Sequence, residues 1–182
     1  MGTVIALPRG RPLTRRDLDR MPDDGHRYEL VDGTLIVTPA PSPRHQAASA
    51  ALFLLLAANC PAELRVLYAP LDVAIDELTV LQPDLLVARK SDFTARDLPM
   101  APLLAVEILS PSTRRVDLHL KRARFEAAGC PSYWVVDPDE PSVTVWQLQG
   151  GEYVEVAHVV GTEQVDLDAP YPLTICPADL VD

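Results

Sequence analysis

Two acidic residues stand at unusual places in apolar segments of the sequence. Asp84 opens the apolar run 85–88 directly after Pro83, which has no backbone N–H to donate to a sheet. Glu107 interrupts an otherwise apolar segment over residues 103–109. A carboxylate buried without a partner costs on the order of several kcal/mol, so something must compensate each acid. These two residues are therefore the first candidates for a functional site.

A divalent cation would compensate both carboxylates at once. Mg²⁺ takes oxygen ligands and is commonly held by one or two carboxylates together with water and substrate phosphate. We therefore expect Asp84 and Glu107 to be metal ligands at the ends of neighbouring strands. The alternative is that each acid meets an arginine or caps a loop, because ion pairs also bury charge. The occurrence of both acids together favours the metal.

A cation for the same site is expected on a helix predicted over residues 115–128. A helical wheel places one set of polar residues toward solvent and another toward the sheet; the sets are His119, Arg122 and Glu126, and Asp117, Lys121 and Arg124. An inward Lys121 could orient a water or stabilise charge on a transferring phosphate, as metal-assisted phosphodiester hydrolysis requires. The alternative is a surface ion pair between Asp117 and Lys121, four residues apart.

Glu29 and His45 are weaker candidates. Glu29 lies in a predicted strand, where it either joins the site or points outward. His45 lies in the first turn of a predicted helix, where it either joins the site or is a satisfied helix-start histidine. The polar turn over residues 110–113 follows Glu107 directly, and it either caps the next helix or lies beside the metal.

Turn chemistry and hydrophobic patterning predict the elements that position these residues. Residues 28–31 and 35–37 flank Asp32-Gly33, a pair suited to the positive φ angles of a type I′ turn, and predict a β-hairpin. A helix is expected over residues 43–58, and its nearly all-round apolar character predicts burial. Further strands are expected at about 64–75, 80–88, 103–109, 132–137, 143–148 and 153–159.

Length and composition predict one compact domain. The chain has 182 residues, of which 48% are hydrophobic, enough to bury a core. We expect a lead with a short helix over residues 1–22 and a single domain over residues 23–182. No run of about 18 uncharged apolar residues occurs, so we expect a cytoplasmic protein without membrane partners. The three cysteines are far apart and are interpreted as small core residues.

The charge balance bears on the substrate. The formal net charge is −10 and the pI is near 4.7, whereas proteins that bind nucleic acid tightly usually present a basic face. Net charge alone therefore disfavours nucleic acid. A bound divalent cation and clustered arginines can still make one cleft positive on an acidic protein.

These residues together resemble a known family. The matching fragments, in chain order, are residues 28–33, 42–46, 82–85, 106–113, 117–121, 129, 133–134 and 136–137. In this order they are similar to the Uma-two-like putative restriction endonucleases, a branch of the PD-(D/E)xK nuclease superfamily. The resemblance extends over about residues 26–180. It implies an α/β (α+β) fold, a restriction-endonuclease-like mixed β-sheet flanked by helices with an N-terminal β-hairpin.

The resemblance also implies roles for individual residues. Asp84 and Glu107 would bind Mg²⁺ or Mn²⁺, with the carbonyl of Ile108 as a further ligand. Glu29 and His45 match motif positions of the family and would be auxiliary site residues.

One position departs from the superfamily pattern. That pattern has a lysine two residues after the second acid, where this chain has Leu109. In this branch the lysine belongs to the following helix, where Lys121 lies. The inward position of Lys121 on the helical wheel supports the same shift independently.

The predicted function is that of a Mg²⁺-dependent endonuclease that hydrolyses DNA phosphodiester bonds, and the resemblance leaves a homodimer open. One alternative is a catalytically inactive nucleic-acid or protein-binding module with the same fold. Another is a metal-dependent hydrolase that acts on RNA or a small phosphoester.

Overall fold

The computed structural model describes residues 8, 10–111 and 114–181. Its first half contains α1 (Arg15–Leu18), β1 (Arg27–Val31), β2 (Thr34–Thr38), α2 (Pro43–Asn59), β3 (Leu64–Tyr68), β4 (Val73–Ala74), β5 (Val80–Leu81), β6 (Leu85–Arg89) and the 3₁₀ turn η1 (Lys90–Asp92). Its second half contains β7 (Leu104–Ile108), the π-helix η2 (Val116–Lys121), α3 (Arg122–Ala127), β8 (Ser132–Asp137), β9 (Ser142–Gln149), β10 (Glu152–Val160), β11 (Val165–Leu167), β12 (Leu173–Ile175) and the 3₁₀ turn η3 (Pro177–Leu180).

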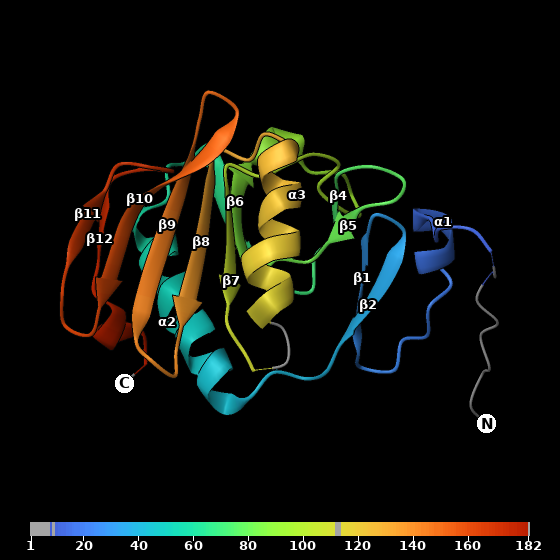
Figure 1. Ribbon diagram of the computed structural model, residues 1–182. Coiled ribbons are helices and arrows are strands. Elements are labelled where there is room, and N and C mark those ends of the chain that lie inside the picture. The colour runs from blue at the N-terminus through green and yellow to red at the C-terminus, as the bar shows by residue number, and fades with distance from the viewer. Residues whose placement is uncertain (1–7, 9, 112–113, 182) are drawn as a thin grey trace.

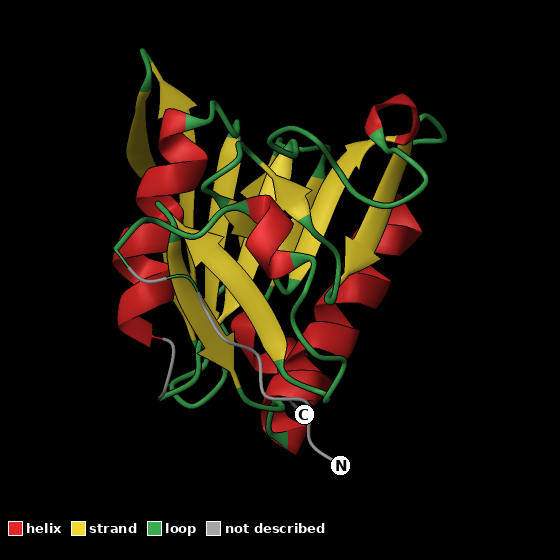
Figure 2. Ribbon diagram, turned by 90° about the vertical axis from the view of Figure 1, so that its right-hand side faces the viewer, coloured by secondary structure: helices red, strands yellow, loops and turns green. Residues whose placement is uncertain are grey.

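A six-stranded mixed sheet forms the centre of the fold, in the order β10-β9-β8-β7-β6-β3. Strands β7 and β8 are parallel, and every other neighbouring pair is antiparallel. Helix α2 packs on one face and α3 on the other, so that the strands lie between two helical layers (Figures 1 and 2). The fold is therefore the α/β (α+β) arrangement expected from the sequence, a mixed sheet flanked by helices.

Helix α2 holds one face of the sheet through a single stripe of side chains. Ser42 accepts a hydrogen bond from the backbone N–H of His45 at 3.2 Å, which caps the first turn. Ala48, Leu52 and Leu56 recur every four residues and are fully buried. The prediction of burial all round is wrong for the opposite side, where Leu54 is 67% exposed. The sheet contacts one side of α2, and the other side faces solvent.

The N-terminal hairpin belongs to a second, four-stranded sheet, in the order β2-β1-β5-β4. Asp32 and Gly33 both have positive φ, at 51° and 75°, as the predicted type I′ turn requires. A Cβ on Gly33 would lie 2.4 Å from Cβ of Pro12, so the position admits only glycine. The hairpin turn is thereby fixed against the N-terminal segment.

The predicted strand over residues 80–88 is divided between the two sheets. β5 pairs with β1 and β4, and β6 pairs with β3 and β7. The break falls at Gln82-Pro83-Asp84, where proline has no N–H for a ladder. Likewise, the predicted strand over 64–75 separates into β3 and β4. Asp84 consequently lies at the junction of the two sheets.

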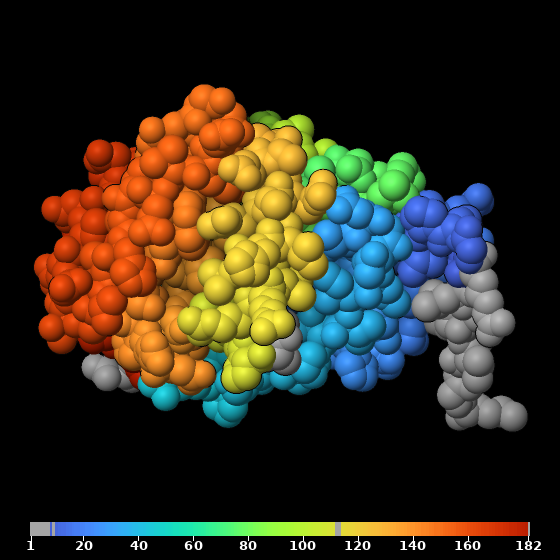
Figure 3. All heavy atoms as spheres, in the orientation of Figure 1, coloured from blue at the N-terminus to red at the C-terminus, as the bar shows by residue number. Residues whose placement is uncertain are grey.

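The second helix begins as a π-helix and continues as α3. In Figure 3 this helical segment lies beside the N-terminal hairpin. Arg124 on α3 pairs with Asp32 at the hairpin turn, at 2.9 Å. This contact corrects the helical wheel, because Arg124 is half exposed and reaches the hairpin instead of the sheet.

Two further expectations concern the cysteines and the membrane. Cys130 is buried, Cys60 and Cys176 are half-buried, and all three are free thiols. Burial raises the pKa of Cys130 to about 11, as expected for a core thiol. Within the described ranges, every helix is too short or too polar to cross a bilayer.

Candidate active site

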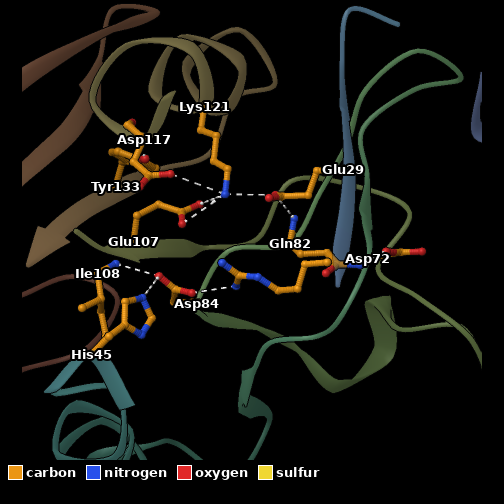
Figure 4. Close-up of polar contacts among 11 residues, drawn as sticks. Glu29, His45, Asp72, Gln82, Asp84, Glu107, Ile108, Asp117, Lys121 and Tyr133 are labelled. Atoms are coloured by element: carbon orange, nitrogen blue, oxygen red, sulfur yellow. Dashed lines mark hydrogen bonds and ion pairs between the residues drawn. The ribbon is translucent and has the colours of Figure 1, made fainter. Parts of the chain in front are cut away.

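Asp84 is held in one orientation by three donors on different elements. It is 4% exposed, and its Oδ2 accepts the backbone N–H of Ile108 at 2.8 Å. The same oxygen lies 3.1 Å from Nε2 of His45, and Oδ1 accepts from Nη1 of Arg27 at 2.7 Å (Figure 4). The carboxylate is thus fixed between α2, β1 and the end of β7.

These contacts determine the charge of Asp84. Burial raises the pKa of its carboxyl, but the hydrogen bond with His45 and the charge of Arg27 outweigh burial. The pKa falls to about 2. Asp84 is therefore ionised throughout the physiological pH range.

A second group of charges surrounds Lys121. Its Nζ lies 3.0 Å from Oε1 of Glu29, 3.1 Å from Oε1 of Glu107 and 3.5 Å from Oδ1 of Asp117. All four side chains are at most 2% exposed. The wider turn of the π-helix places Asp117 and Lys121 on the same inner side (Figure 4). One ammonium group therefore faces three buried carboxylates.

The pKa values of Lys121 and Glu107 are both raised. Burial lowers the pKa of Lys121, but Glu107, Glu29 and Asp117 outweigh it and raise the pKa above its ordinary value. Burial raises the pKa of Glu107 well above its usual range, and the opposing effect of Lys121 is smaller. The lysine is therefore protonated at neutral pH, while Glu107 resists ionisation.

The two groups meet because antiparallel pairing places Asp84 beside Glu107. The register of β6 and β7 pairs Leu85 with Val106. Asp84, which precedes Leu85, therefore lies next to Glu107, which follows Val106. In the resulting network, four carboxyl groups (Glu29, Asp84, Glu107 and Asp117) face two cations (Arg27 and Lys121), so the buried carboxyl groups outnumber the cations by two.

This excess of buried carboxyl groups bears on whether the site suits a metal ion. Within the described residues, Oε2 of Glu29 has no hydrogen-bond partner. Oε1 of Glu107 also lacks a hydrogen bond of good geometry, although it lies within ion-pair distance of Lys121. Buried negative charge and open carboxylate oxygens fit a hard divalent cation. No group of three His, Cys, Asp or Glu side chains in the described ranges forms a complete cage, so water or substrate would supply the remaining ligands.

The structure brings all five predicted side chains into one buried network. Glu29 does not point outward, because it is fully buried. Lys121 points inward as the wheel predicts, and its pair with Asp117 is buried instead of lying at the surface. The arginine alternative for Asp84 is also realised, through Arg27. His45 lies in the first turn of α2 and contacts Asp84 through Nε2, whereas its Nδ1 has no hydrogen-bond partner among the described residues.

Three residues of the network were missed by sequence reasoning. Arg27 lies two residues before Glu29 on β1, and strand alternation could have placed both on one face. Gln82 donates its backbone N–H to Oε1 of Glu29 at 2.7 Å. Tyr133 donates its hydroxyl to the backbone carbonyl of Asp117 at 2.7 Å, which only the long-range pairing of β8 brings about.

Leu109 and the polar turn over residues 110–113 follow Glu107 in the chain. Leu109, in the position of the superfamily lysine, is 5% exposed and packs in the core beneath α3. Of the polar turn after Glu107, residues 112–113 lie outside the described residues.

A cleft opens beside Asp84. Its volume is about 760 Å³, and Arg27, His45 and Asp84 are among the residues that line it. A smaller hollow of about 190 Å³ shares Arg27 and His45 and reaches Ser110. The charged loop over residues 89–102 lines neither of them. The cleft therefore reaches Asp84 and His45, whereas Glu107 and Lys121 lie buried behind its lining.

Comparisons with known proteins give one family and one fold. The profile of the Uma2 family, described as "Putative restriction endonuclease", matches residues 15–177. A crystal structure of "a putative nuclease belonging to DUF820 from Anabaena variabilis" is similar with a TM-score of 0.72 and 22% sequence identity, covering 93% of this chain and 98% of that one. No curated protein matches the chain. At this identity, the structural match shows a shared fold.

Proposed function

Because the chain belongs to the Uma2 family of putative restriction endonucleases, we propose that it is a metal-dependent endonuclease that hydrolyses DNA phosphodiester bonds. The observation that carries the proposal is the buried ion pair of Glu107 and Lys121, which lies next to Asp84 on the lining of an open cleft. Residues 23–182 would act as one nuclease domain.

The acids of the network are the proposed metal ligands. Asp84 and Glu107 would hold Mg²⁺ or Mn²⁺, with the carbonyl of Ile108 as a further ligand. When bound, such a metal activates a water and neutralises charge at the scissile phosphate. Asp84 is suited to this role because its pKa of about 2 keeps it ionised without metal.

Lys121 acts as a fixed positive charge in this proposal. Its raised pKa keeps the amine protonated, so it cannot serve as a general base at neutral pH. A protonated amine can donate N–H groups to negative charge that develops on the phosphate. Glu29, itself bound by the backbone of Gln82, holds the amine in place.

Arg27 and His45 support the site from the cleft side. Both contact Asp84 and both line the cleft. His45 orients the carboxylate, and Arg27 offers a cation to an anionic ligand that enters beside it. Arg27 would then exchange part of its contact with Asp84 for a phosphate oxygen.

Nicking of supercoiled plasmid with Mg²⁺ or Mn²⁺ tests the proposal. The wild type should cleave, and Asp84→Asn and Glu107→Gln should each lower the rate by at least about 100-fold, as loss of a catalytic electrostatic partner does. Asp139→Asn is the matched control, because Asp139 is an exposed acid that pairs only loosely with Arg44, at 3.8 Å. Cleavage that persists in either site variant, or in EDTA, would contradict the mechanism.

A second candidate is a binding module without catalysis, which one observation favours. Both oxygens of Asp84 already have partners in Arg27, His45 and Ile108, so a metal would have to share this carboxylate with three donors. Calorimetric titration with Mn²⁺ separates the candidates. The nuclease should bind Mn²⁺ in the wild type and lose binding in Asp84→Asn, whereas the module should show no binding that depends on Asp84.

A further inference from the structure

The cleft beside Asp84 has an exposed apolar wall. Leu54 on α2 is 67% exposed and Tyr68 at the end of β3 is 61% exposed, and both line the cleft. They are the two most exposed large hydrophobic side chains among the described residues. Exposed apolar groups gathered at one concave place indicate a binding surface.

Tyr68 is held close to the proposed catalytic residues. The register of β3 and β6 pairs it with Leu85, the residue after Asp84. The next backbone N–H, that of Ala69, donates to the carbonyl of Asp84 at 3.0 Å. Phe53 supports the ring from α2, with centroids 5.4 Å apart and planes at 89°. These contacts place Tyr68, part of the apolar wall, beside Asp84.

The charge of the cleft is poorly suited to a double helix. Arg27 is the one lysine or arginine among the described residues that line it, and Asp23 lies on the same lining. Duplex binding without base contacts depends on many phosphate contacts from Lys and Arg, and the protein carries a formal charge of −10. Binding to this cleft must therefore draw on apolar contact more than on phosphate neutralisation.

We propose that the cleft binds an unpaired nucleotide, with its base against Tyr68 and Leu54, so that the enzyme acts preferentially on single-stranded DNA. This inference rests on the proposed function for the identity of the ligand. An unstacked base presents a flat apolar face to an aromatic ring, and its backbone carries a phosphate to the neighbouring site. A volume of about 760 Å³ suits a ligand of this kind, whereas a paired base cannot leave the duplex without unstacking.

Binding without cleavage tests this inference. The full chain in EDTA is titrated into a fluorescein-labelled DNA strand of about 12 nucleotides, and into the same strand annealed to its complement. The single strand should bind at least tenfold more tightly. Its affinity should fall with salt at a slope of only about −0.7 to −1.4, which corresponds to one or two phosphates.

Substitutions in the wall then locate the binding. Tyr68→Ala should weaken single-strand binding by about 5- to 150-fold, the range for one base–aromatic stack. Tyr68→Phe should keep it, because the ring remains. Leu54→Ala should weaken binding, and Leu120→Ala is its matched control, since Leu120 is also exposed but lies on η2 away from the cleft. Thermal unfolding checks that each variant is folded.

The outcomes distinguish this inference from the proposed function. Tighter binding of duplex than of single strand, or unchanged affinity in Tyr68→Ala, overturns the inference even if plasmid is cleaved. Single-strand binding that depends on Tyr68 supports it, and it does so even if metal-dependent cleavage fails and the proposed function is lost.

Discussion

Replacing Lys121 by methionine removes the ammonium group that contacts Glu29, Glu107 and Asp117 while leaving a side chain of similar length. Breaking a buried ion pair in this way typically costs about 3–5 kcal/mol, because a charge stays buried after it has lost its counter-charge. A protein of this size has a total stability of roughly 5–15 kcal/mol. The substitution should therefore consume a large part of the free energy of unfolding.

The assay is urea and thermal unfolding at neutral pH, followed by circular dichroism. At about 2–4 °C per kcal/mol for a chain of this length, the melting temperature should fall by roughly 6–20 °C. Lys90→Met is the matched control, because Lys90 is the other lysine of the sequence, is exposed, and donates only to the carbonyl of Ala62. That control should cost less than about 1 kcal/mol.

Two further measurements check the electrostatic cause. Lys121 opposes the rise in the pKa of Glu107, so without Lys121 that pKa rises further, and the loss of stability should shrink as the pH falls and Glu107 becomes protonated. Addition of Mn²⁺ should stabilise Lys121→Met more than the wild type, because a divalent cation replaces the missing charge. If Lys121→Met lost no more stability than Lys90→Met at every pH, Lys121 would not be the charge that balances the network.

Three other predictions address acid stability, packing and the hairpin. The pKa of Asp84 is about 2 in the folded protein and 3.8 ordinarily, so its ionisation should add about 2 kcal/mol to the free energy of unfolding above pH 4. This contribution should be lost as the pH falls toward 2. Urea unfolding between pH 4 and pH 2 should show the loss in the wild type and not in Asp84→Asn. Leu52→Ala should cost about 2–5 kcal/mol and Leu54→Ala less than about 0.5 in thermal unfolding, since the first is fully buried and the second is 67% exposed. Gly33→Ala should cost at least about 1 kcal/mol in urea unfolding, because its φ is positive and its Cβ would overlap Pro12, and an unchanged midpoint would contradict this packing.

Local chemistry in the sequence predicts much of this molecule. Asp32-Gly33 predicts the hairpin because its φ requirements are local. Asp84 and Glu107 are conspicuous because each interrupts an apolar segment. Helical periodicity alone places Lys121 inward, which the structure confirms.

The features that escaped prediction depend on contacts between distant segments. Strand patterning cannot show that residues 80–88 change sheets at Pro83, because the two halves are equally apolar and differ only in their partners. Arg27 becomes part of the site only when β1 lies beside the start of β6. The π-helical turn has no signature in hydrophobic periodicity, so its wider spacing was not expected.

The location of the lysine on a helix also has an evolutionary consequence. If relatives carry this cation on the strand at the position of Leu109, the two arrangements must be connected by a chain with both lysines or with neither. The network has four carboxyl groups and two cations, so a second lysine adds compensating charge, whereas a chain with neither lysine loses the ion pairs that Lys121 makes with Glu29, Glu107 and Asp117. We therefore expect the helix lysine to have been gained before the strand lysine was lost. Urea unfolding tests this order. The double variant Leu109→Lys/Lys121→Met should lose less stability than the sum of the losses of the two single variants.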